Sequence, residues 1–272
     1  MSAIAYFNEV LMNRSLFVHQ RTAALLLQHW RSGDLLTELP ASLKPETLKQ
    51  GYDSQDQLFA AAAGPRAGWK LGVGSPAGMR AGKLSRPLIG QLEAGRCHAD
   101  GAHIQLPAVT PVTIECEIAF VLDRDIPPQA GRVPVSEDIR ATCVTFEVVR
   151  SRFVDRKAVG WPSFVADNVG FEALVVGNSL GAGINVPLLA DLAETTEVHV
   201  DGQRRVGGLS GDAATDPLVS LAHLYAHAAE RGQTLKAGDV VTTGAMCQPF
   251  DLHETGHQVS ARFLGQALTF TL

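Results

Sequence analysis

The stretch Thr113-Ile-Glu115-Cys-Glu117-Ile-Ala-Phe-Val-Leu122 decides the fold prediction for this chain. Successive side chains of a β-strand point to opposite faces, and this stretch alternates with that period of two. One predicted face is wholly apolar and consists of Cys116, Ile118, Phe120 and Leu122. Glu115 and Glu117 share the other face with Ala119 and Val121. The pattern therefore predicts a strand that carries two neighbouring carboxylates into a partly apolar setting.

Two carboxylates side by side repel each other unless a cation or a proton lies between them. Ligation by oxygen alone suits a hard divalent ion such as Mg²⁺ or Mn²⁺. Two solvated charges on the edge of a strand are an equally good interpretation of the pair by itself.

A third carboxylate, Glu147, lies in the strand-like run Cys143-Val-Thr-Phe-Glu147-Val-Val. A glutamate among apolar neighbours is costly to bury unless it is paired or coordinated. Three carboxylates on strands can occupy one face of an octahedral metal site and leave the other positions to water and substrate.

Lys70 stands in the middle of another predicted strand, between Trp69 and Leu71. A lysine at the edge of a sheet extends its amine into water, which is one interpretation. In a dry site, the same amine can bind a carboxylate or stabilise an enolate.

Helical patterns fill the N-terminal part of the chain, and strand patterns dominate the rest. The series Ala23, Leu26, Leu27 and Trp30 marks one face of a helix that ends near Gly33, and Pro45 opens a second helix towards Ala63. Two further helices are predicted, a short one capped by Ser136 and one over residues 217–231 capped by Asp216. Strands are predicted at 69–74, 115–122, 143–151, 172–177, 196–201, 239–243, 257–263 and 267–271. This order indicates an α+β fold with a largely antiparallel sheet, comprising a helical region (1–66) and a β domain (67–272).

Composition excludes several classes of protein. The 272 residues carry a net charge of −5, which gives no reason to expect binding to nucleic acid. The longest apolar runs are too short to span a bilayer, and the N-terminus does not read as a signal peptide. Four widely spaced cysteines read as reduced thiols, so we expect a cytoplasmic protein.

Beyond these local patterns, the chain resembles a known family over essentially its whole length. It is similar to the 2-keto-4-pentenoate hydratase and 4-oxalocrotonate decarboxylase family of the wider fumarylacetoacetate-hydrolase superfamily. The motifs that carry the resemblance are Gly68-Trp-Lys70-Leu-Gly72-Val-Gly74-Ser75, Glu115-Cys-Glu117-Ile-Ala-Phe-Val121, Glu147-Val-Val-Arg-Ser151-Arg152-Phe153, Val165-Ala-Asp167-Asn168 and Gly238-Asp-Val-Val-Thr-Thr-Gly244.

The resemblance implies that the fold is a mixed β-sandwich roll with a helical N-terminal region. It also implies that the protein is a lyase, either a hydratase or a decarboxylase. Its substrates would be 2-hydroxy-2,4-dienoates or 2-oxo acids formed in the degradation of aromatic compounds. It implies that Glu115, Glu117 and Glu147 bind Mg²⁺ or Mn²⁺, and that Lys70 acts beside the substrate's carboxylate and enol oxygen. Further substrate contacts are implied for Gly72, Arg152, Asp167, Asn168 and Thr243. It also implies a homo-oligomer.

Three positions depart from the family's pattern. Leu88 stands where hydratases of the family carry an acidic residue, Arg150 replaces another acid, and Val169-Gly170-Phe171 follows Asn168 where serines are usual. Leucine, glycine and phenylalanine cannot transfer a proton through their side chains. Two alternatives therefore stay open. One is a carbon–carbon hydrolase acting on acylpyruvates, which would need a water-activating base, commonly a His/Glu pair; the sequence assigns no such pair, although His19 and His29 lie in the predicted N-terminal helices. The other is a catalytically silent partner subunit.

Overall fold

The computed structural model of the chain describes residues 3–108 and 111–272, with side chains from residue 15 onward. The chain forms two compact units. The first contains Met1–Gly64 and Ser151–Gly170, and the second contains Pro65–Arg150 and Phe171–Leu272. The first unit thus includes a segment, 151–170, that the sequence pattern placed with the β domain.

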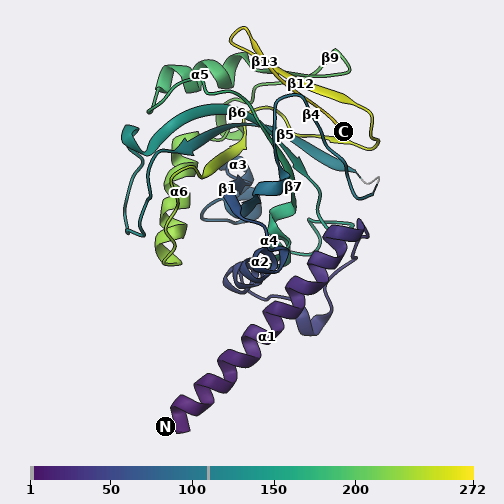
Figure 1. Cartoon of the computed structure of the whole chain (residues 1–272), viewed down its shortest axis with the longest axis vertical. Coiled ribbons are helices and arrows are strands. Elements are labelled where there is room, and N and C mark those ends of the chain that lie inside the picture. Colours follow the sequence, from purple (N-terminus) through teal and green to yellow (C-terminus); the bar gives the residue numbers. More distant parts are fainter. Residues whose placement is uncertain (1–2, 109–110) are drawn as a thin grey trace. The chain divides into compact units, whose positions relative to one another are not determined.

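The first unit is helical, as predicted. It contains α1 (Ala3–Ser32), α2 (Leu48–Ala62) and α4 (Trp161–Ala166), with 3₁₀ turns at Ala41–Leu43 and Asn168–Gly170 (Figure 1). The predicted apolar face of α1 is buried, with Leu26 fully covered and Trp30 nearly so. Helix α2 begins later than predicted, because the side chain of Thr47 accepts a hydrogen bond from the backbone N–H of Gln50 and caps it. No helix within residues 3–108 and 111–272 has the length and apolar character needed to cross a bilayer.

The second unit contains two sheets. The order of strands in the larger sheet is β2-β1-β10-β5-β6-β7-β3, with β11 also paired to β5, and the order in the smaller sheet is β4-β13-β12-β8-β9. The bounds of the strands are β1 Arg66–Gly72, β2 Leu88–Glu93, β3 Cys97–Ala99, β4 Ala102–His103, β5 Val112–Leu122, β6 Ile139–Val149, β7 Phe171–Val176, β8 Glu197–Val200, β9 Gln203–Gly207, β10 Val240–Ala245, β11 Phe250–Leu252, β12 Gln258–Phe263 and β13 Gln266–Thr271. Most neighbours are antiparallel, and the β1–β10, β3–β7 and β4–β13 pairs are parallel. The predicted α+β fold with a largely antiparallel sheet is confirmed.

The two sheets pack face to face through the apolar side chains of β5 and β6. Figure 1 shows β12 and β13 lying over β5 and β6. The ring of Phe146 on β6 lies 5.1 Å from the ring of Phe270 on β13, centroid to centroid. Because Phe146 pairs with Cys116, this contact places the predicted apolar face of β5 between the sheets. The face that carries Glu115 and Glu117 must then point away from the smaller sheet.

Strands β1 and β10 approach each other closely at Gly68. A Cβ atom there would lie 1.9 Å from the carbonyl oxygen of Val240, and the φ angle of Gly68 is +151°. Only glycine accommodates this contact, and it fixes the register in which Lys70 pairs with Thr242. The glycine that precedes Trp69 therefore helps to place Lys70.

The helices of the second unit differ from the prediction. The helix capped by Asp216 is confirmed as α6 (Pro217–Glu230). The helix predicted at Ser136 is only a 3₁₀ turn, because the buried carboxylate of Asp138 is bound by Arg124, Arg132 and Tyr225 instead of facing water in a helical first turn. Two short helices were not predicted, α3 (Pro76–Gly82) and α5 (Val186–Thr195).

Stability is expected to fall in acid through His227, which lies buried on α6. Burial and the charges of Arg231 and Arg86 lower its pKa to about 3. The unfolded chain takes up this proton near pH 6.5 and the folded chain does not, so stability is lost as the pH falls below 6.5. Between pH 7.5 and pH 5.0, urea unfolding should show that His227→Gln loses about 2 kcal/mol less stability than the wild type. Equal losses in both proteins would contradict this assignment.

Candidate functional site

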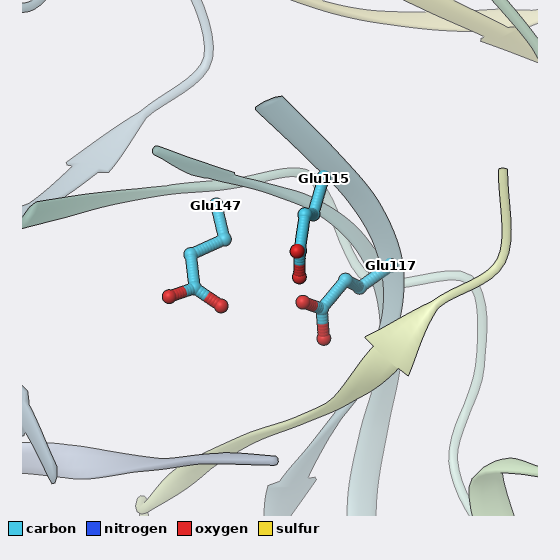
Figure 2. Close-up of side chains that lie close together, drawn as sticks. All are labelled: Glu115, Glu117 and Glu147. Carbon is cyan, nitrogen blue, oxygen red and sulfur yellow. The ribbon is translucent and has the colours of Figure 1, made fainter. Parts of the chain in front are cut away.

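The register of β5 against β6 brings the three predicted glutamates together. Glu115 pairs directly with Glu147, and Glu117 follows two residues later on the same face of β5. One carboxylate oxygen from each lies within 4.8 Å of the others (Figure 2). Glu117 and Glu147 are fully buried, and Glu115 is half-buried. The interpretation of the Glu115–Glu117 pair as a solvated strand edge therefore fails.

Lys70 belongs to the same face of the sheet. It pairs with Thr242 of β10, which in turn pairs with Ala119 of β5, two residues from Glu117. Its Nζ atom lies 2.5 Å from Oε1 of Glu147, and both side chains are at most 2% exposed. Strand β1 also lies between β2 and β10. Lys70 is thus an interior lysine and not one that extends from a sheet edge.

A β-bulge in β10 orients Glu117. Thr242 pairs with Ala119, but Ala245 pairs with Glu117, so β10 has one extra residue between these two pairs. Within the bulge, Gly244 adopts a φ of +100°, and its backbone N–H donates a 2.7 Å hydrogen bond to Oε2 of Glu117. The backbone conformation that aims this N–H favours glycine. The bulge therefore fixes one oxygen of Glu117 and leaves the other directed elsewhere.

The buried carboxylates lack the compensation that such groups need. No hydrogen-bond donor in the described part of the chain reaches Oε1 of Glu117 or Oε2 of Glu147. Burial raises the pKa of Glu117 well above its usual range, and the charges of Glu147 and Glu115 raise it further. Burial also raises the pKa of Glu147 to about 7, although Lys70 opposes the shift. One lysine does not balance three crowded carboxylates, so the oxygen set fits a hard divalent cation.

Two further predicted residues lie on strands of this sheet. Gly72 ends β1 and pairs with Leu88, which is buried at the start of β2. Since Gly72 and Lys70 are two residues apart, Leu88 shares the face of Lys70 and presents only an apolar side chain there. The hydroxyl of Thr243 donates a 2.7 Å hydrogen bond to the carbonyl of Ile118, which occupies it in the sheet.

The other predicted residues, Arg152, Asp167 and Asn168, are buried in the first unit. The guanidinium of Arg152 forms an ion pair with Asp167 and lies 4.9 Å from the centre of the Trp30 ring. Asp167 also accepts hydrogen bonds from the hydroxyl of Ser151 and from the backbone N–H of Arg152. Arg152 and Asp167 are thus brought together with each other.

Asp167 precedes an unusual turn. Asn168 and Val169 have positive φ angles of 51° and 52°, which β-branched valine rarely adopts. Gly170 follows, also with a positive φ, and its N–H donates to the carbonyl of Asp167. The Arg152–Asp167 pair is therefore placed to hold this turn.

Gly244 and Thr242 are site residues that the sequence analysis missed. Gly244 appears in the Thr-Gly motif, but nothing local predicts a bulge that turns its N–H towards a glutamate. Thr242 lies on the face of Lys70, whereas the predicted Thr243 points to the opposite face. Alternation along β10 places the side chains of the two threonines on opposite faces of the sheet. Only the pairing of β10 with β1 and β5 shows which of them shares the face of the glutamates.

Comparison with known proteins identifies the family. Residues 79–269 match the model of the family described as fumarylacetoacetate (FAA) hydrolase C-terminal. A 2-keto-4-pentenoate hydratase from Paraburkholderia phymatum is 31% identical over 204 residues, which cover 74% of this chain and 76% of the relative. A 4-oxalocrotonate decarboxylase from Pseudomonas sp. (strain CF600) is 26% identical, with 93% of this chain and 97% of the relative covered.

A solved structure shares the fold. The 4-oxalocrotonate decarboxylase from Pseudomonas putida G7, complexed with magnesium and adipate, has a TM-score of 0.81 at 22% identity. The match covers 93% of this chain and 96% of that one, so the helical region and the β domain both have counterparts there. With the family model spanning most of the chain, this protein belongs to the fumarylacetoacetate (FAA) hydrolase C-terminal family.

Proposed function

We propose that this protein is a divalent-metal-dependent lyase, a hydratase or a decarboxylase, that acts on 2-hydroxy-2,4-dienoic or 2-oxo acids. The observation that carries the proposal is the cluster of Glu115, Glu117 and Glu147 beside the buried amine of Lys70. The hydratase and decarboxylase relatives support the same class of reaction. Mg²⁺ and Mn²⁺ are the ions that we expect in the site.

The three glutamates would hold the ion, each through one oxygen. A bound divalent ion supplies Lewis-acid stabilisation to the carboxylate and keto oxygens of a 2-oxo acid. Gly244 keeps Glu117 in place through its N–H. Lys70 adds a fixed positive charge beside Glu147, where negative charge on an enolate oxygen would be stabilised. Burial of both Lys70 and Glu147 excludes water and strengthens these interactions.

The hydrolase alternative has less support in the structure. Such an enzyme needs a base to activate water, commonly a His/Glu pair, and the histidines of the N-terminal helix are His19 and His29. The ring of His19 hydrogen-bonds to the hydroxyl of Ser54 at 2.9 Å, and the ring of His29 bonds to the carbonyl of Asp34. Among the described residues, neither ring has a glutamate as a hydrogen-bond partner. A homo-oligomer and a cytoplasmic location stay predictions from the sequence.

A product-resolved assay tests the proposal. The purified protein receives 2-hydroxypenta-2,4-dienoate, 4-oxalocrotonate or an acylpyruvate, each with Mg²⁺ and with EDTA, and the products are identified by NMR. We expect water addition or loss of CO₂ with one of the first two substrates, abolished by EDTA. Cleavage of the acylpyruvate alone would favour the hydrolase. No turnover of any substrate, with Mn²⁺ still bound, would favour the silent partner subunit.

A further inference from the structure

The hydroxyl of Thr242 lies buried within the larger sheet. Thr242 is fully covered, and its Oγ1 finds no partner within the described residues. Burying an unpaired hydroxyl is unfavourable, and most buried polar groups in proteins are bonded. An exception in the middle of a sheet calls for a functional explanation.

Other buried threonines in this unit are satisfied. The hydroxyl of Thr243 donates to the carbonyl of Ile118, that of Thr145 to the carbonyl of Glu117, and that of Thr196 to the carbonyl of Leu192. Thr243 lies on β10 beside Thr242, and Thr145 lies on β6, with β5 between these two strands. The sheet therefore offers acceptors to threonines in this region. The unpaired state of Thr242 is therefore specific to its position.

That position lies among the groups of the candidate site. Thr242 pairs with Lys70 on one side and with Ala119 on the other, so all three side chains point to the same face. Glu117 lies on the same face of β5, two residues before Ala119. The side chain of Ala119 is only a methyl group. A small acid that reached both the glutamates and Lys70 would pass over the row that contains Thr242.

We infer that Thr242 is a substrate-binding residue whose hydroxyl donates a hydrogen bond to an oxygen of the bound 2-oxo or 2-hydroxydienoic acid. This inference rests on the proposed function. The carboxylate, keto and enolate oxygens of such an acid are hydrogen-bond acceptors. The hydroxyl of Thr242 is a donor that has no acceptor among the described residues. Leu88 and Ala119 offer no polar group on this face, so Thr242 supplies a neutral donor beside the charge of Lys70.

The test compares Thr242→Val, Thr242→Ser and the matched control Thr196→Val with the wild type. Valine keeps the volume of threonine and removes the hydroxyl, and serine keeps the hydroxyl. Calorimetry measures the binding of Mn²⁺, and then the binding of oxalate to the Mn²⁺-loaded protein. Oxalate is an unreactive probe that presents two adjacent oxygens, as a 2-oxo acid does. Thermal melting of the metal-free proteins gives a readout that needs neither metal nor turnover.

Thr242→Val should bind Mn²⁺ like the wild type and bind oxalate roughly tenfold to a hundredfold more weakly, because a hydrogen bond to a charged group is lost. Thr242→Ser should stay within a few-fold of the wild type. Metal-free Thr242→Val should melt no lower than the wild type, since no hydrogen bond is lost, whereas Thr196→Val should melt lower and bind oxalate normally.

Three results would overturn the inference. If Thr242→Val binds oxalate as tightly as the wild type, the hydroxyl does not contact the ligand, and the proposed function still stands. If Thr242→Val melts as far below the wild type as Thr196→Val does, its hydroxyl is part of the folded structure. A wild-type protein that binds no Mn²⁺ would refute the proposed function, and the inference with it.

Discussion

Glu117→Gln is expected to weaken Mn²⁺ binding by about 100-fold or more while the fold is kept. The amide has nearly the volume of the carboxylate, and its oxygen can still accept the N–H of Gly244. The variant loses a negative charge that a hard divalent ion requires. Lys70 keeps its partner Glu147, which makes this variant cleaner than Glu147→Gln, where a buried amine would be left unpaired. Calorimetric titration measures the affinity for Mn²⁺, and circular dichroism checks that the fold is kept.

A matched surface change controls for the loss of charge. Glu197 is half-exposed and pairs with Arg204, so Glu197→Gln removes the same charge far along the sequence from the three glutamates. We expect it to bind Mn²⁺ within twofold of the wild type. If Glu117→Gln binds Mn²⁺ as tightly as this control does, the carboxylate cluster is not the metal site.

Lys70→Met is expected to lower turnover by about 10²–10³-fold without loss of metal binding. Removing one fixed donor beside a developing oxyanion has effects of this size in other enzymes. The variant also leaves Glu147 buried without its ion-pair partner, which should cost the metal-free protein about 3–5 kcal/mol. A bound cation would replace the lost charge, so Mn²⁺ should raise the melting temperature of the variant more than that of the wild type.

The control for this change is Lys236→Met, which removes an exposed lysine that pairs with Asp125. We expect normal turnover and little change in melting temperature, because exposed ion pairs contribute little to stability. Wild-type turnover in Lys70→Met would exclude a role of the amine in the reaction. Loss of Mn²⁺ binding would instead place Lys70 among the groups that build the metal site.

Much of the fold follows from local sequence patterns. The alternation in 113–122 predicts β5 and separates its apolar face from its carboxylates, and the periodicity around Trp30 predicts the buried face of α1. These features are local because one element decides which side chains share a face. The three short helices α3, α4 and α5 were missed, although Ser75 and Asn185 cap two of them and a proline stands within two residues of each cap. Short helices with glycine or proline resemble turns, and tertiary packing decides between them.

The site itself depends on pairings that local patterns do not contain. Glu147 lies opposite Glu115 because of the register between β5 and β6, and the two residues are 32 positions apart in the sequence. The pairing of Thr242 with Lys70 joins residues even farther apart in sequence, and the bulge at Gly244 shifts the register again. Resemblance to a family supplied the three glutamates and Lys70 together. It indicated Thr243, whereas the strand pairing places the neighbouring Thr242 on the face of Lys70.

A divalent ion held by Glu115, Glu117 and Glu147 is the feature on which the proposed function depends. The most direct measurement is an anomalous difference map from a crystal of the protein soaked in Mn²⁺. We expect one strong peak at coordination distance, roughly 2.0–2.6 Å, from an oxygen of each glutamate. A map in which Mn²⁺ binds elsewhere, or in which Lys70 alone occupies the space between these carboxylates, would contradict it.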